Sequence, residues 1–341
     1  PYSDKLNLKL VNSPFLKDLD QEKYRIYLRS VKNQIEIFRE DNIPLFTTME
    51  EKQQEYGAIS AEMSIEVDGE NINMQKAAQL LKSTDRSKRE EIYNKISSRR
   101  LQDEKVLDDL FDELISLRQQ IAKNADFDNY RDYMFAAMGR FDYTPKDCFN
   151  FHDAIAKEIV PIINSFEQKR KNKLGNESYK PWDTAVDVDG LPPLKPFDGG
   201  TELTDLSIEC FDRLRPYFGE CLSTMKAMKH LDLESKNGKA PGGFMYPLYE
   251  IGVPFIYMNA VGSQRDLVTM VHEGGHAVHS FLSRDLSLTE FKSTPSEVAE
   301  LASMAMELLS MDHWDVFYDD SADLKRAKLE QLEKALETLP W

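Results

Sequence analysis

The chain has 341 residues, of which 41% are hydrophobic and 30% are charged, and its formal net charge is −16. This length can bury a substantial core and leads us to expect two or three domains. The negative charge opposes binding to nucleic acids or anionic membranes, because phosphate contacts need clustered Lys and Arg side chains. The sequence contains no run of about 18 apolar residues, so no transmembrane helix is predicted. Nucleic acids and membranes are therefore not expected partners.

The N-terminus and the cysteines indicate the compartment. Residues 1–6 contain neither an initiator Met nor the apolar core of a signal peptide. We therefore expect a cytoplasmic chain or a piece of a longer one, and the missing Met favours the piece. Cys148, Cys210 and Cys221 have no C-x-x-C spacing, which suits reduced thiols in a cytosol better than a disulfide framework.

Helical periodicity dominates the first half of the chain. Residues 20–56 have the spacing of a long amphipathic helix, and apolar residues return to the i, i+3, i+4 pattern between 74 and 123. Residues 61–74 alternate around an Asp-Gly pair, which predicts a β-hairpin. With a further helix expected near 145–173, residues 1–186 are predicted to form a helical lobe with one short hairpin.

The second half begins with a loop signal. Residues 187–200 are rich in Pro, Gly and Asp, which predicts a linker or a long surface loop. A helix is expected at about 203–230. Residues 237–260 then combine Gly and Pro with aromatic residues and are predicted to form a strand pair. We treat residues 201–341 as a second region, and it contains a cluster of histidines.

The histidine cluster is predicted to lie on a helix at 263–283, which begins at a capping box of Ser and Asp. His272 and His276 stand at i and i+4, so their Cβ atoms are about 5–6 Å apart on one face. Two imidazoles at that separation can reach a common Zn²⁺ with bonds of about 2.0–2.1 Å. Glu273, one residue round from His272, can address a water on the metal without being a ligand.

A histidine on a helix is more often a surface or core residue than a ligand, so the neighbouring sequence matters. Gly274 and Gly275 each cost about 1 kcal/mol relative to Ala inside a helix, so close backbone packing or a helix kink must favour them. His279 lies at i+7 from His272, near the same face. Because a catalytic zinc site needs only three protein ligands, we expect His279 to support the site or pack in the core.

The third ligand is expected downstream, among Glu290, Glu297, Glu300 and Glu307. Glu297 already has a structural role at the third position of a helix that is expected to begin with Thr294 as its N-cap and Pro295 as its first residue. Glu300 lies three residues further into that helix and is favoured as the ligand. Glu307 lies two turns beyond it on the same face and is expected to support the site without being a ligand.

These residues resemble the oligoendopeptidase F and thimet oligopeptidase family of zinc metallopeptidases. Residues 272–279 match the H-E-x-G-H-x-x-H form of the family, and residues 299–303 resemble its third-ligand segment, which independently selects Glu300. Residues 237–244 are similar to the Gly-rich strand region before the zinc helix. Weaker likeness extends through residues 129–134, so the resemblance covers most of the chain.

The resemblance implies a mainly α, helical zincin fold with a small β-sheet beside the zinc helix and a deep substrate channel. It implies a zinc-dependent endopeptidase that cleaves short peptides, with one Zn²⁺ per chain on His272, His276 and Glu300. Glu273 would be the general base that takes a proton from water and later delivers it to the leaving amine. Residues 201–341 would then be the zinc-binding catalytic region.

The family continues past the third ligand into a segment whose Tyr and His side chains bind substrate, whereas this chain stops at Trp341. We therefore expect an internal fragment whose catalytic region is incomplete at its C-terminus. Two alternatives remain open. The chain can be an inactive fragment or helical binding module that retains a zinc site, or it can be a zinc hydrolase that does not act on peptides.

Substrate contacts are predicted before the histidine helix. Gly242 and Gly243 lack side chains, so an extended peptide main chain can approach and pair with the strand there. Tyr246, together with Tyr249 and Tyr257, can line the channel, although aromatic residues in strands are more often part of the core. The oligomeric state is left open by the sequence.

Overall fold

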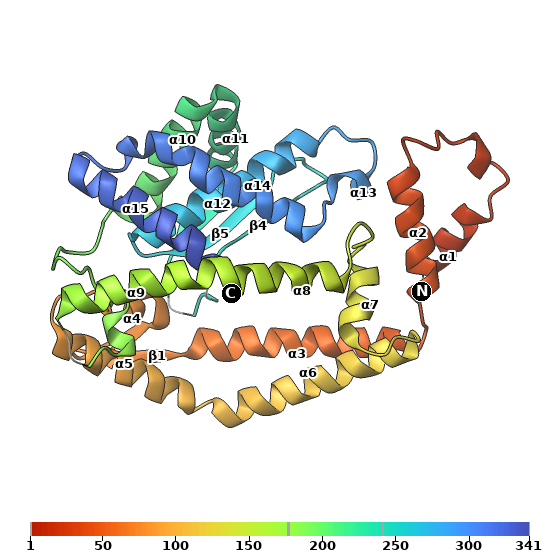
Figure 1. Ribbon diagram of the computed structural model, residues 1–341. Helices are drawn as coiled ribbons and strands as arrows, with labels where there is room; N and C mark the ends of the chain where they lie inside the picture. The colour runs from red at the N-terminus through yellow and green to blue at the C-terminus, as the bar shows by residue number, and fades with distance from the viewer. Residues whose placement is uncertain (1, 176–177, 237, 241, 341) are drawn as a thin grey trace. The chain divides into compact units, whose positions relative to one another are not determined.

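The computed structural model describes residues 2–175, 178–236, 238–240 and 242–340 (Figure 1). Helices account for most of these residues, and the strands form two small sheets. The expected mainly α fold with a small β-sheet is confirmed. No helix in the described part of the chain combines the length and the apolar character that a membrane span requires.

The chain forms two compact units that interleave along the sequence. The first comprises Pro1–Ile59, Asp103–Asn150 and Ser287–Pro295, and the second comprises Ser60–Gln102, Phe151–Leu286 and Ser296–Trp341. The division expected from the sequence, at 187–200, does not coincide with these units. Residues on both sides of that segment belong to the second unit.

Residues 187–198 are irregular, as predicted, but they pack into the second unit. Arg326 Nε lies 3.6 Å from a carboxylate oxygen of Asp187, and Arg326 Nη2 donates to the carbonyl of Pro192 at 2.5 Å. Leu194 and Phe197 are buried in the core of this unit. These contacts make the segment a packed loop of one unit, which is why the chain does not divide there.

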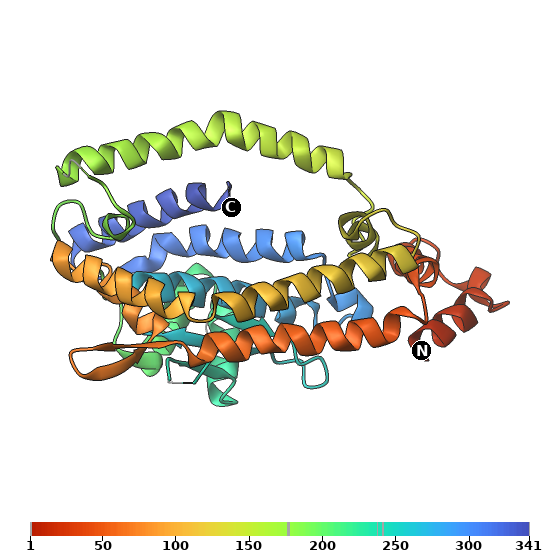
Figure 2. The ribbon, with the colours of Figure 1, turned by 90° about the horizontal axis from the view of Figure 1, so that it is seen from below.

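The first unit contains α1 (Tyr2–Val11), η1 (Leu16–Asp18), α2 (Arg25–Ile37), α3 (Asn42–Glu62), α6 (Glu104–Asn124), α7 (Tyr130–Ala137), the start of α8 (Pro145–Ala154) and α13 (Thr289–Lys292). The helices α3 and α6 run side by side (Figure 2) and bury Met49 against Leu110 and Leu114. Asn42 is buried between them and donates to the carbonyl of Ile121 at 3.0 Å.

The predicted long helix at 20–56 is interrupted, and Pro44 explains the interruption. Proline lacks the backbone N–H, and its ring clashes with the carbonyl four residues earlier in a continuous helix. The chain therefore leaves the helical conformation after α2, and α3 begins at Asn42, which places Pro44 in its first turn. A similar break separates α10 (Gly199–Leu214) from α11 (Pro216–Ala227), because Arg215 before Pro216 is extended at φ −163°.

The second unit contains the predicted hairpin, the site-bearing helices and the larger sheet. Its elements are β1 (Ser64–Val67), β2 (Glu70–Asn73), α4 (Met74–Leu80), α5 (Arg86–Leu101), η2 (Ile155–Ile159), α9 (Val160–Leu174), η3 (Pro181–Asp183), α10 (Gly199–Leu214), α11 (Pro216–Ala227), β3 (Leu231–Glu234), β4 (Phe244–Tyr246), β5 (Phe255–Ala260), α12 (Gln264–Ser283), α14 (Ser296–Ser310), η4 (Met311–Val316) and α15 (Ser321–Thr338).

The hairpin expected near 61–74 is present. Its strands pair antiparallel from Ser64 opposite Asn73 to Val67 opposite Glu70. Asp68 and Gly69 in the turn have φ values of 53° and 82°, the positive values that a two-residue type I′ turn requires at both positions. Ile65 and Val67 pack against α4 and α5 in a small core of their own.

The three-stranded sheet has the order β3-β5-β4, with β3 parallel and β4 antiparallel to β5. The expected strand pair is therefore extended by β3, which lies before the predicted range. Asn237 and Pro241 of that range lie outside the described residues. Ile256 and Met258 of β5 are buried in the same core as residues of α12. β4 lies at the edge of the sheet.

α12 begins at the predicted capping box, with reciprocal hydrogen bonds between Ser263 and Asp266. It passes without interruption through Gly274 and Gly275. A Cβ on Gly274 would lie 2.7 Å from Cζ of Phe211 in α10. A Cβ on Gly275 would lie 2.9 Å from Cβ of Met306 in α14. Close helix packing, and not a kink, therefore explains both glycines.

A buried carboxylate ties α5 to the segment before the packed loop. Asp183 is fully buried and accepts from Arg86 Nη2 at 2.8 Å, Arg89 Nη2 at 2.9 Å and the Lys180 backbone N–H at 3.0 Å. Burial alone would raise the pKa of Asp183, but the hydrogen bonds from Arg86 and Arg89 outweigh it and lower the pKa to about 2. Arg89 is itself buried, so each partner depends on the other.

Asp183→Asn is expected to lower the free energy of unfolding by about 3–5 kcal/mol, because it leaves a buried arginine without its counter-charge. Asp189→Asn is the control, since its ion pair with Lys173 at 2.9 Å is exposed and is worth about 0–1 kcal/mol. Urea unfolding measures both. Equal stability of the two variants would contradict the assignment.

The stability that Asp183 contributes is also expected to depend on pH. Because its folded pKa lies below the unfolded value, this stability is present above about pH 4 and is lost as pH falls through about 2.

Gly275→Ala is expected to destabilise the second unit, because its methyl group would also lie 3.0 Å from the Ser303 Cα, which is backbone. Overpacking costs about 1–3 kcal/mol, and the better helix propensity of Ala recovers only about 1 kcal/mol. Gly57→Ala is the control in a helix, since nothing lies within 4 Å of its Cβ position. Thermal melts should show loss for the first variant and no loss for the second. A stabilised Gly275→Ala chain would refute the packing explanation.

Candidate metal centre

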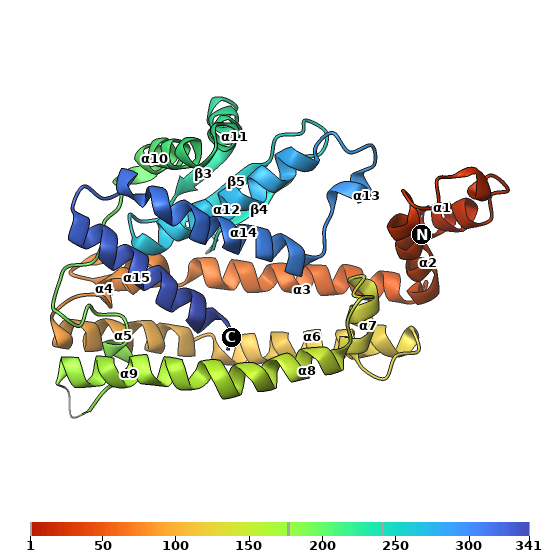
Figure 3. The same cartoon turned by 45° about the horizontal axis from the view of Figure 1, so that its top comes forward.

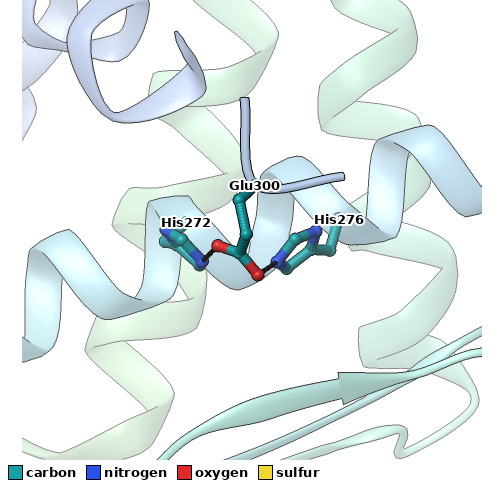
Figure 4. Close-up of side chains that lie close together, drawn as sticks. All are labelled: His272, His276 and Glu300. Carbon is teal, nitrogen blue, oxygen red and sulfur yellow. Dashed lines mark ion pairs between the residues drawn. The ribbon is translucent and has the colours of Figure 1, made fainter. Parts of the chain in front are cut away.

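Two helices of the second unit bring three potential ligands together. His272 and His276 project from α12, and Glu300 reaches between them from α14 (Figure 4). His272 Nε2 lies 3.2 Å from Glu300 Oε2, and His276 Nε2 lies 3.5 Å from Glu300 Oε1. The three ligand atoms that could hold one ion all lie within 4.8 Å of one another.

The donor types and their proximity fit a zinc ion. The two imidazole Nε2 atoms approach different oxygens of the Glu300 carboxylate, which stands between them, and one ligand atom from each residue lies within 4.8 Å of the others. Two imidazoles and one carboxylate are a known donor set of catalytic zinc sites, which leave the fourth position open. The residues present therefore fit the ion that the sequence predicts.

His272 is held from behind by a carboxylate. Its Nδ1 lies 2.6 Å from Oε1 of Glu307, which follows Glu300 by about two turns of α14. The other oxygen of Glu307 accepts from Gln331 Nε2 of α15 at 2.6 Å. A carboxylate that accepts from Nδ1–H leaves the Nε2 lone pair free for a metal. The structure therefore places Glu307 at His272, where it can support the site as expected.

Glu273 lies beside the ligands and points to the sheet. Its side chain is buried, and its carboxylate accepts a hydrogen bond from the backbone N–H of Met245 in β4. This contact orients the carboxylate and joins α12 to the edge strand. The sequence does not identify Met245 or Gln331, because a backbone donor leaves no residue signature and a single helical Gln is common.

The pKa values in the cluster are displaced by burial and by charge. Burial lowers the pKa of His272 as the largest effect, but the hydrogen bond and charge of Glu307, with the other carboxylates, outweigh it and raise the pKa overall. Burial, followed by the charge of His272, lowers the pKa of His276. Burial raises the pKa of Glu273, against the opposing effect of His272. Such displaced values gather at functional sites.

The other candidate ligands do not join this group. His279 is half-buried one turn beyond His276 and is not among the three residues whose ligand atoms converge. Glu297 also lies outside that group, and Glu290 belongs to the first unit. Within the described residues, His272, His276 and Glu300 form the one group of three that could hold a metal ion.

The glycines and the tyrosine before α12 lie next to the edge strand. Gly242 has a φ of +104°, and the space beside its Cα is open. A Cβ on Gly243 would lie 2.9 Å from Cγ2 of Thr269, so its small size serves packing of the strand on α12. Tyr246 is 60% exposed on β4.

Comparison with models of protein families gives a match. The model described as "Peptidase family M3" matches residues 79–202 and 217–339. An oligoendopeptidase F homolog of Lactococcus lactis subsp. lactis is 23% identical over 166 residues, which are 49% of this chain and 27% of that protein. An oligoendopeptidase F homolog of Borreliella burgdorferi is 26% identical over 184 residues, which are 53% of this chain and 30% of that protein.

Solved structures share the fold. A putative oligoendopeptidase F from Bacillus anthracis aligns with a TM-score of 0.93 at 23% identity, over 98% of this chain and 61% of that one. PZ peptidase A with inhibitor 2 aligns with a TM-score of 0.92 at 25% identity, over 98% of this chain and 59% of that one. The chain thus spans less than two thirds of these proteins.

The family match covers well over half of the chain and includes both site-bearing helices. The histidine motif resembles the same family, and a putative oligoendopeptidase F shares the fold. On these grounds the chain belongs to peptidase family M3.

Proposed function

We propose that this chain carries the catalytic centre of a zinc-dependent endopeptidase that hydrolyses short peptides. The observation that carries the proposal is the convergence of His272, His276 and Glu300, whose ligand atoms lie within 4.8 Å of one another, with Glu273 buried beside them. Family membership supports peptide bond hydrolysis as the reaction. Because the chain spans only part of its relatives, the activity of the whole protein is part of the proposal.

His272, His276 and Glu300 would hold the zinc ion. When bound, zinc lowers the pKa of a coordinated water to about 7 and polarises the carbonyl to be attacked. Glu307 keeps the Nδ1 proton of His272 engaged at 2.6 Å, so that Nε2 stays available as a ligand. The half-exposed Glu300 carboxylate leaves one side of the group open to solvent.

Glu273 is the proposed general base. It accepts the proton of the attacking water and then delivers it to the nitrogen of the leaving amine. The Met245 N–H interacts with its carboxylate and limits the orientations available to it, and the side chain is buried. A fixed carboxylate next to the ligands can reach the water without being a ligand itself.

The substrate is proposed to bind along β4. One side of this strand pairs with β5, and the sheet order leaves the other side at the edge. An extended peptide can add its main chain to such an edge, which favours short unfolded peptides over folded proteins. The exposed Tyr246 ring is available for the peptide's side chains, and the open space at Gly242 permits approach of another backbone.

Glu273→Gln is expected to keep one zinc per chain and to reduce cleavage of a pool of short peptides by about 100-fold or more, because the amide cannot accept the proton. Metal analysis and mass spectrometry of the products measure the two effects. Glu220→Gln, an exposed substitution in α11, is the control. Full activity of the Glu273→Gln variant would remove Glu273 from its role, and zinc in a wild-type chain without cleavage would favour a binding module.

Glu300→Ala is expected to weaken zinc binding more than the about 10–100-fold loss that follows removal of an outer hydrogen-bond partner, because it deletes a ligand. Glu297→Ala removes a carboxylate one turn earlier in the same helix and should leave zinc affinity within about twofold. Competition against a chromophoric chelator measures both dissociation constants. Equal losses, or the larger loss at Glu297, would reassign the third ligand.

A further inference from the structure

We propose that Gln331 of α15 is a positioning residue for the metal centre, which acts through Glu307 on His272. This inference rests on the proposed function, since it concerns the same centre. Two hydrogen bonds join the three residues in line. Gln331 Nε2 donates to Glu307 Oε2 at 2.6 Å, and Glu307 Oε1 lies 2.6 Å from His272 Nδ1.

The burial of Gln331 indicates that its amide has a purpose. Its side chain is 3% exposed, and only Ala327, four residues earlier, is also fully buried within Ser321–Thr338, all of whose residues are described. These two positions share one face of α15. A buried amide is costly unless it is hydrogen-bonded, and a leucine there would avoid that cost. Gln331 instead supplies a donor to Glu307.

The donor completes the hydrogen bonding of a carboxylate that is itself 13% exposed. Oε1 of Glu307 contacts the imidazole of His272, and Oε2 accepts the hydrogen bond from Gln331. The terminal torsion of a glutamate is broad, so a single hydrogen bond permits the carboxylate plane to rotate. A second bond, from a different helix, fixes that plane and hence the ring of His272.

The orientation of the amide follows from the same contact. The carbonyl oxygen of Gln331 would repel a carboxylate oxygen at 2.6 Å, so the NH₂ group must face Glu307. The carboxylate can then accept from His272 Nδ1–H, which leaves Nε2 to point to Glu300 at 3.2 Å. The direct hydrogen-bond partner of a ligand, here Glu307, typically changes metal affinity about 10–100-fold, and Gln331 acts through that partner.

Figure 3 shows α15 alongside α14, the helix that carries both Glu300 and Glu307. Away from the centre, Arg326 of α15 binds Asp187 and the Pro192 carbonyl of the packed loop. A change in the position of α15 would therefore change the hydrogen bond from Gln331 to Glu307 and, through it, the affinity for the metal.

The test compares zinc binding of wild-type and Gln331→Met chains by chelator competition. Met has a similar length but no donor, so zinc binding should weaken about tenfold while the melting temperature of the metal-free chain stays near wild type. The visible spectrum of the Co²⁺-loaded chain should also change, because the imidazole ring is no longer fixed. Gln168→Met, an exposed glutamine of α9, should change neither. If Gln331→Met does not fold, Gln331→Leu replaces it.

The same substitution in a Glu307→Ala background separates positioning from general packing. If Gln331 acts through Glu307, its replacement there should change zinc affinity by less than about twofold. An equal loss of zinc affinity in both backgrounds would overturn the inference, and so would wild-type zinc affinity in the Gln331→Met single variant. In either case, zinc binding by the wild-type chain would still support the metal centre. A wild-type chain that binds no zinc would overturn the proposed function and this inference together.

Discussion

The close approach of α12 to α14 is the constraint on which the rest of the site depends. His272 and His276 come from one helix and Glu300 from the other, so ligand spacing is set by the distance between two backbones. Gly275 permits that distance, because any side chain there would meet the backbone of α14. Gly275 lowers the intrinsic stability of the helix, but it allows the two helices to approach closely and so fixes the separation of the ligands. Packing and coordination chemistry are specified by the same contact.

The sheet and α15 hold this helix pair from different sides. Met245 of β4 donates to the carboxylate of Glu273, so the proposed base and the proposed peptide-binding edge are joined by one hydrogen bond. Gln331 of α15 donates to Glu307, and Glu307 in turn contacts Nδ1 of His272, the ring nitrogen that does not face Glu300. Glu273 and His272 are therefore each contacted by an element other than their own helix. This is how side chains with several free torsions are held in one geometry.

Much of the candidate site, and less of the fold, could be predicted from the sequence. The placement of His272 and His276 on one face is predictable because helical spacing is a local property. The approach of Glu300 from a second helix is a contact between distant segments, and its segment is singled out by its resemblance to the family's third-ligand segment. The hairpin is predictable because an Asp-Gly turn is local too. The two interleaved units are not, since they depend on contacts between distant segments, such as Arg326 with Asp187. Helix periodicity also conceals the breaks that the prolines impose.

An open sheet edge that can receive a peptide can also receive another copy of the chain. β4 limits that hazard by its length, since it has only three residues, Phe244–Tyr246. Pro247 follows immediately and has no N–H to donate, so a hydrogen-bond ladder cannot be extended in that direction. Short edges ending in proline resist edge-to-edge aggregation. The strand thus has the length to align a few residues of the proposed peptide and is too short to nucleate a continuous intermolecular sheet.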